Sequence, residues 1–228
     1  MLSPTDAKTV IPPPVLQSWA VTASILLGTT PKIVLNTPDV QTKFSPLAAV
    51  ASVVPFYYSG FAYKDEDFVA HYAALCEAVD IPVYAYNNPK TTGFQMSPEL
   101  IVQLAAVGVS GMKDSSGDYA YLVEVIRELD KKAPNFNVMS GSASLYQPLS
   151  YQGARGCVAG TSNAFPELLV ALDQALQDGD LLQASELQSS IIALRKIQNI
   201  RGFRPASCYT LLRMRGLDVG TTRAPWVV

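Results

Sequence analysis

Lys113 is the residue of this sequence whose chemistry is most suggestive. It follows the apolar run Val107–Met112, so we expect it where a buried strand ends. Partial desolvation at such a place disfavours the ammonium relative to the free amine, and a free amine can attack a ketone to form an imine. A lysine at a strand end often extends to solvent or pairs with a neighbouring carboxylate, here Asp114. The residue alone leaves both interpretations open.

Tyr86 supplies a second group for the same chemistry. It lies 27 residues before Lys113, at the end of the preceding expected strand. If the two strands are parallel neighbours, both side chains project into one mouth. A phenol there can relay a proton to or from a substrate oxygen and the carbinolamine that precedes an imine. By itself Tyr86 could equally be a rim aromatic, so it is the pair that favours imine chemistry.

The elements that must position these residues are visible as alternating patterns. From about residue 50, short apolar runs alternate with amphipathic helical runs, which is typical of βα units around a parallel sheet. The pattern predicts strands at 53–57, 82–86, 108–113, 137–140 and 156–160. It predicts helices at 65–79, 119–131 and 143–151, and one that begins at Pro98 behind the capping residue Ser97.

The carboxyl-terminal part has a different character, with helical periodicity alone at 167–177, 181–198 and 205–215. We therefore divide the chain into a (β/α) barrel domain, residues 1–165, and a helical segment, residues 166–228, packed on the barrel. Residues 1–50 are irregular, although 20–27 and 32–35 could be strands. They would bring the total to roughly six or seven, whereas a closed barrel has eight.

Composition excludes several classes of function. A formal net charge of −2 offers no basic excess for nucleic acid. His71, the single histidine, lies in a helical pattern, so a His-rich metal site is excluded. Polar residues and Pro31 interrupt the apolar stretch 15–35, which therefore fits neither a membrane span nor a signal. The glycines near 153 and 156 fit a strand turn as well as a phosphate loop. The three cysteines, which are far apart in the sequence, are interpreted as reduced thiols of the core: Cys76, Cys157 and Cys208. Reduced cysteines are typical of cytosolic proteins, so we expect a cytoplasmic protein.

Several ordered segments resemble the dihydrodipicolinate synthase and N-acetylneuraminate lyase superfamily. Two of them are signature segments, Tyr86–Gly93 and Gly111–Asp118. The others are the aromatic strand end 54–58, the loop 140–142 and the strand 153–158 with 161–163. Five segments at mutually consistent spacing, over about residues 50 to 223, make the resemblance specific.

The resemblance implies a (β/α)8 TIM-type barrel, usually tetrameric, in which Lys113 forms a Schiff base with pyruvate or another 2-oxo acid. It implies that Tyr86 is the proton relay and Tyr57 the aromatic near a subunit contact, with the backbone around Gly141 and Val158 lining the pocket. We expect no metal and no organic cofactor, because the protonated imine is itself the electron sink. The expected partners are a 2-oxo acid and an aldehyde, in a homo-oligomer that is a dimer or tetramer.

Two departures refine this expectation. Thr91 occupies a substrate-binding position where dihydrodipicolinate synthases usually have a carboxylate-binding arginine, and neighbouring Lys90 offers only a point charge. The triplet Gly28–Thr30, with Thr29 and Thr30 as candidate carboxylate ligands, lies only 25 residues before Val53. It could correspond to the family's Gly-Thr-Thr-Gly-Glu-like loop or to the strand that follows it.

We therefore expect a lyase or aldolase of 2-oxo-3-deoxy sugar acids, hydroxy-oxoglutarate or an N-acetylneuraminate-type substrate. The alternative within the superfamily is a 4-hydroxy-tetrahydrodipicolinate synthase. The short amino-terminal region suggests that one or two βα units are missing or replaced, leaving the barrel incomplete at its amino terminus. An alternative of another class is therefore a truncated, non-catalytic homologue that acts as a binding or assembly subunit.

Overall fold

The computed structural model of the chain describes residues 50–53, 63–199 and 204–222. Its strands form one parallel sheet in the order β1-β2-β3-β4-β5. Within these residues the strands are β1 (Val50–Val53), β2 (Val83–Asn87), β3 (Gly111–Asp114), β4 (Asn137–Ser140) and β5 (Gly156–Cys157). Parallel neighbours in chain order are the arrangement of consecutive strands in an α/β barrel. The expected α/β fold with a parallel sheet is confirmed.

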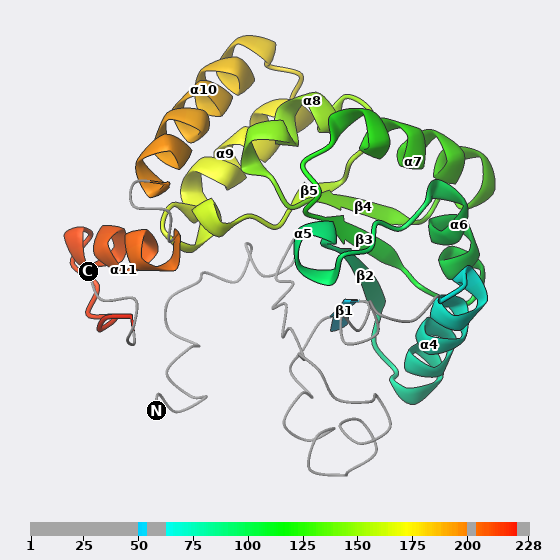
Figure 1. Cartoon of the computed structure of the whole chain (residues 1–228). Coiled ribbons are helices and arrows are strands. Elements are labelled where there is room, and N and C mark those ends of the chain that lie inside the picture. The colour runs from blue at the N-terminus through cyan, green and yellow to red at the C-terminus, as the bar shows by residue number, and fades with distance from the viewer. Residues whose placement is uncertain (1–49, 54–62, 200–203, 223–228) are drawn as a thin grey trace.

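Helices follow the strands and cover one face of the sheet (Figure 1). Between β1 and β4 these are α4 (Asp65–Ala78), the short α5 (Pro89–Thr92), α6 (Pro98–Ala106) and α7 (Tyr119–Lys132). After β4 come a 3-10 turn (Ala143–Leu145), α8 (Tyr146–Ser150), β5, a second 3-10 turn (Gly160–Asn163), α9 (Pro166–Gln177), α10 (Leu181–Gln198) and α11 (Arg204–Met214).

Capping residues explain where three of the helices begin. The Ser97 hydroxyl accepts a hydrogen bond from the Leu100 amide at 3.1 Å, ahead of Pro98 in the first turn of α6. Asp118 and Asp180 do the same for α7 and α10, in each case accepting from the amide three residues later at 3.0 Å. Such caps satisfy amides that have no partner inside the helix.

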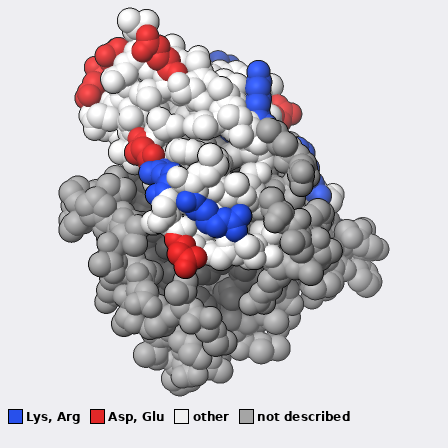
Figure 2. Space-filling model, turned by 90° about the vertical axis from the view of Figure 1, so that its left-hand side faces the viewer, with Lys and Arg blue, Asp and Glu red and all other residues white. Residues whose placement is uncertain are grey.

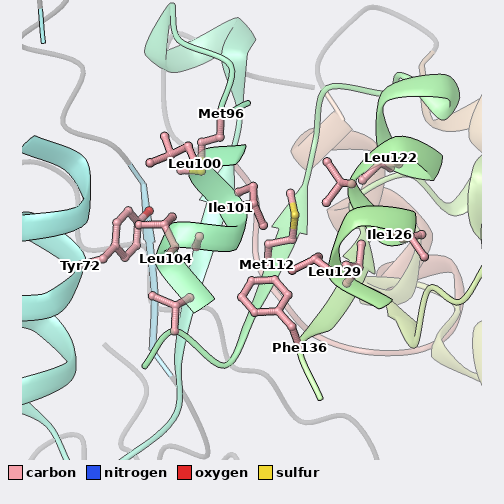
Figure 3. Packing of buried hydrophobic residues seen from close by; sticks show 14 of the residues in the cluster. Tyr72, Met96, Leu100, Ile101, Leu104, Met112, Leu122, Ile126, Leu129 and Phe136 are labelled. Atoms are coloured by element: carbon pink, nitrogen blue, oxygen red, sulfur yellow. The ribbon is translucent and has the colours of Figure 1, made fainter. Parts of the chain in front are cut away.

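The main core lies between the sheet and helices α4, α6 and α7 (Figure 3). Met112 on β3 belongs to one buried cluster with side chains from all three helices, which include Tyr72, Leu100, Ile101, Leu104, Leu122 and Ile126. A second cluster joins α9 to α10 through Leu172, Ala184 and Ile191. Because strand side chains alternate, the residues flanking Met112, which are Gly111 and Lys113, face the other side of the sheet.

That other face carries its own packed group. Tyr84 and Met139 are buried there, with Val158 against them. The Tyr84 ring lies over Gly111, and its hydroxyl accepts a hydrogen bond from Asn137 Nδ2 at 3.1 Å. A Cβ atom on Gly111 would come within 2.4 Å of the Tyr84 ring and 2.5 Å of the Asn137 carbonyl oxygen. Glycine is therefore required at this position.

Several expected boundaries are wrong, although the expected strand at 137–140 and helices α4, α6, α7, α9 and α10 are confirmed. The third strand begins at Gly111 and not at Gly108, because Val107 and Gly108 still donate to carbonyls at the end of α6. The fifth ends at Cys157, since the chain turns into the 3-10 turn at Gly160.

The first strand was expected at 53–57. The structure describes a strand at Val50–Val53, and residues 54–57 lie outside the described residues. The expected strands at 20–27 and 32–35 lie outside the described residues. The division at residue 165 and the incomplete barrel stay predictions.

Charge on the described surface is mixed in sign. Figure 2 shows one face, on which acidic and basic side chains lie among uncharged ones. One ion pair links the end of α11 to α9, with Arg215 Nη1 2.8 Å from Glu167 Oε1. Both side chains are substantially exposed, so the pair contributes at most about 1 kcal/mol.

Among the described helices, none combines the length and the apolar character that a membrane crossing needs. The cytoplasmic location stays a prediction.

The Tyr84–Gly111 contact yields a test of the sheet. Gly111→Ala should lower the free energy of unfolding by about 1–3 kcal/mol, because the added methyl meets a ring and a backbone carbonyl. Gly160→Ala is the matched control, since a Cβ atom there meets nothing within 4 Å. Urea denaturation of both variants measures the difference. Equal stability of the two would show that the close contact is not formed.

Candidate active site

The structure brings Tyr86 and Lys113 together at the carboxyl edge of the sheet. They are partners in the ladder between β2 and β3. The Lys113 Nζ atom lies 4.0 Å from the centroid of the Tyr86 ring. The amine therefore sits on the face of a phenol, within the range of a cation–π contact when it is charged.

The Tyr86 hydroxyl is held by two neighbours. Ser115 Oγ donates to it at 3.3 Å and Asn88 Nδ2 at 3.4 Å. The second hydrogen of the Asn88 amide is donated to Thr91 Oγ1 at 2.9 Å. The phenol oxygen accepts both bonds, so among the described residues neither of these neighbours uses its hydrogen, which can serve a group that approaches Lys113. Thr91 is thus connected to the phenol through Asn88.

Asp114 has other partners than the neighbouring amine. Its carboxylate accepts from Asn87 Nδ2 at 2.7 Å and from Ser116 Oγ, also at 2.7 Å. The side chain is buried, with 2% of its surface exposed, and it lies on the helix side of the sheet. The half-buried Lys113 points to the opposite side. Alternation along β3 therefore separates the two charges.

A second cation approaches from α10. Arg195 Nη1 donates to Ser142 Oγ at 2.7 Å, in the loop after β4. Burial raises the pKa of the Cys157 thiol to about 12, while the positive charges of Arg195 and Lys113 act in the opposite direction. Both cations therefore lie within electrostatic reach of one thiol. Arg195 also lines a small pocket together with Gly141, Ala159, Gly160, Thr161, Gln198 and Cys208.

Gly141 belongs to this edge by close backbone contact. Its amide donates to the Asp114 carbonyl at 2.6 Å, and a Cβ atom on it would lie 2.3 Å from that oxygen. Val158, the other residue expected to line the pocket, packs against Tyr84 and Met139 on the same face of the sheet as Lys113. Any side chain larger than glycine at 141 would push the loop after β4 away from β3.

The remaining expected site residues, Thr29, Thr30 and Tyr57, lie outside the described residues. Sequence reasoning did not single out Ser115, Asn88 or Arg195. Ser115 and Asn88 stand inside the two signature segments, so their position next to Lys113 and Tyr86 was the available signal. Arg195 lies in a long helical pattern, and nothing in that pattern marked it as a residue of the site.

In the described ranges no three His, Cys, Asp or Glu side chains gather as metal ligands would.

Comparison with known proteins gives concordant results. The Dihydrodipicolinate synthetase family matches residues 41–228. An uncharacterised DapA-like lyase of Halobacterium salinarum is 36% identical over 179 residues, which are 77% of this chain and 56% of the relative. The chain thus spans little more than half the length of that relative.

Solved structures match as well. Dihydrodipicolinate synthase from Bacteroides thetaiotaomicron has a TM-score of 0.78 and 25% identity, over 90% of this chain and 69% of that one. A variant of the Sulfolobus solfataricus 2-keto-3-deoxygluconate aldolase has a TM-score of 0.69 and 26% identity, over 82% of this chain and 62% of that one.

The environment of Cys157 yields a test by alkylation. In the folded protein its pKa is about 12 instead of the ordinary 9.0. At pH 8.5 the native thiolate fraction should therefore be roughly a thousandfold below that of the unfolded chain. Peptide mass spectrometry after iodoacetamide treatment, in buffer and in urea, measures both rates. Equally fast labelling of Cys157 in the two solvents would contradict this.

Proposed function

Because the chain belongs to the dihydrodipicolinate synthetase family, we propose that it is a class I lyase or aldolase that binds a 2-oxo acid as a Schiff base on Lys113. One observation carries the proposal, namely Lys113 Nζ 4.0 Å from the Tyr86 ring, on paired residues of adjacent strands. Imine formation needs an amine nucleophile and a proton relay beside it. Lys113 and Tyr86 supply these two groups.

The proposed steps use only these side chains. The free amine of Lys113 adds to the C2 carbonyl of the 2-oxo acid, and the carbinolamine oxygen leaves as water with a proton from the Tyr86 phenol. The resulting iminium draws the electrons of the C3–C4 bond as the Tyr86 phenolate takes the proton of the C4 hydroxyl and an aldehyde departs. The enamine that remains takes up a proton at C3, and hydrolysis releases pyruvate. Condensation is the same sequence in reverse.

The environment of Tyr86 tunes this relay. Ser115 and Asn88 both donate to its oxygen, which fixes the orientation of the phenol beside Lys113. Asn88 is itself oriented by Thr91. No metal or organic cofactor enters the scheme, because the iminium accepts the electron pair.

The substrate that we propose is a 2-oxo-3-deoxy sugar acid, hydroxy-oxoglutarate or an N-acetylneuraminate-type compound. Thr91 binds Asn88 through a neutral hydroxyl and offers no guanidinium for a second carboxylate. A 2-keto-3-deoxygluconate aldolase among the matched structures is consistent with this choice. A 4-hydroxy-tetrahydrodipicolinate synthase is the alternative in the same family. We further propose a homo-oligomer, either a dimer or a tetramer.

Borohydride reduction in the presence of pyruvate tests the nucleophile. The imine should be reduced to a stable secondary amine on Lys113, seen by intact and peptide mass spectrometry. Lys113→Ala should lose this adduct, while Lys90→Ala, which removes an exposed lysine near the site, should keep it. A folded protein without an adduct at high pyruvate would refute the catalytic proposal and favour a non-catalytic binding or assembly subunit.

Removing the Tyr86 hydroxyl tests the relay. Tyr86→Phe keeps the ring over Lys113 but loses the proton donor, so the rate of adduct formation at saturating pyruvate should fall by about 10²–10⁴-fold. Tyr84→Phe is the matched control on the same face of β2, because it removes a hydroxyl that binds Asn137 instead. Equal rates for the two variants would rule out Tyr86 as the relay.

A further inference from the structure

Behind Tyr86 and Lys113 lies a buried polar pair that the proposed reaction does not use. Asn87 and Asp114 follow them directly in β2 and β3 and are likewise partners in the ladder. Their side chains are 1% and 2% exposed. Asn87 Nδ2 donates to Asp114 Oδ1 at 2.7 Å. Alternation puts this bond on the helix side of the sheet, opposite the amine and the phenol.

The pair is part of a network in which the donors and acceptors match. Asp114 Oδ2 accepts from the Ser116 amide at 3.1 Å and from its hydroxyl at 2.7 Å. Asn87 Oδ1 accepts from the Met96 amide at 3.2 Å. The Tyr121 hydroxyl accepts from Asn87 Nδ2 at 3.4 Å and donates to the Met96 carbonyl at 2.8 Å. The network therefore joins β2, β3, α7 and the segment before α6.

The hydrogen-bond donors and acceptors of the network define the role of the Asp114 carboxyl and the orientation of the Asn87 amide. The groups that hydrogen-bond to Asp114 come from Asn87, Ser116 and the Gly117 backbone, and all of them are donors. Its side chain therefore serves as an acceptor throughout, as an ionised carboxylate does. Burial raises the pKa of this carboxyl above its ordinary value, and the hydrogen bonds from Ser116, Asn87 and Gly117 oppose that rise without cancelling it. The orientation of the Asn87 amide follows, because its oxygen faces the Met96 amide and its nitrogen faces Asp114 and Tyr121.

The network also sets where the chain goes after Lys113. The bond from the Ser116 amide to Asp114 Oδ2 closes a turn of the Asx type, directly at the end of β3. Within that turn the Ser115 amide donates to the Asn87 carbonyl at 2.8 Å. Ser115 Oγ then reaches the Tyr86 hydroxyl. The same bonds thus determine the position of Lys113, of Ser115 and, through Ser115, of the phenol.

We propose that Asn87 and Asp114 form a positioning pair that holds the amine of Lys113 and the phenol of Tyr86 in register for imine formation. The inference rests on the proposed function. Neither residue touches the substrate in this scheme; they act through the strand ends and through Ser115. A purely structural role would lower stability without a separate effect on the chemical step.

Isosteric exchange separates these two roles. Asn87→Asp sets two carboxylates against each other, and Asp114→Asn sets two amides against each other, with hardly any change in volume. The double exchange restores one donor facing one acceptor at this contact and keeps the net charge. Tyr121→Phe is a milder probe, since it removes only the hydroxyl between Asn87 and Met96.

Borohydride trapping with pyruvate provides the measurement, at a temperature where thermal unfolding shows each protein folded. Each single exchange should slow trapping at saturating pyruvate by on the order of tenfold to a hundredfold. The pyruvate concentration for half-saturation should change much less. The double exchange should recover most of the rate, and Tyr121→Phe should show a smaller loss.

Leu172→Ala is the control for stability alone. It removes a fully buried side chain from the α9–α10 cluster, away from the network, and should unfold earlier but trap at the wild-type rate. Single exchanges that trap like wild type, a double exchange no faster than the singles, or a Leu172→Ala variant that is equally slow would each overturn the positioning role. Wild-type protein without any adduct would instead overturn the proposed function, and the positioning role with it.

Discussion

The register between β2 and β3 is the constraint on which the rest of the site depends. It sets Tyr86 opposite Lys113, and a shift by one residue would turn one of the two side chains to the other face. Contacts on both faces support this register. Met112 is fully buried among the helices, while Gly111 leaves room for a tyrosine ring on the opposite side. The packing of the core on both faces of the sheet therefore also fixes the geometry of the site.

The carboxyl-terminal helices take part in the same arrangement through one stripe of α10. Gln188 Nε2 donates to the Ala143 carbonyl at 2.9 Å, and Gln198 Oε1 accepts from Thr161 Oγ1 at 3.0 Å. Arg195 lies between them and donates to Ser142. These polar groups contact the loops that follow β4 and β5, and both glutamines are buried. α10 therefore carries a charge to the edge of the sheet where Lys113 lies.

Pattern and capping predicted which elements exist, but tertiary contacts decide where they end and what their side chains bind. The cap Ser97, the amphipathic pattern at 119–131 and the apolar run before Lys113 are local signals, which is why α6, α7 and β3 were expected. Gly108 belongs to an apolar run, yet its amide still bonds to α6, so the strand begins later. The pairing of Tyr86 with Lys113 followed from the parallel sheet. The bonds of Ser115 and Asn88 to the phenol depend on the turns after each strand, and no periodicity reports those.

Lys113 and Asp114, at the end of β3, show how an amine nucleophile can lie next to a buried carboxylate without pairing with it. An ion pair between Lys113 and Asp114 would engage the amine, and adjacent residues of a strand cannot readily form one because they face opposite sides. Asp114 instead has three hydrogen bonds from Asn87 and Ser116, which stabilise a buried carboxylate without a cation. Its negative charge still lies one residue from the amine. The amine thus lies on the face of a phenol, while the charge on the other side of the strand is held by neutral donors.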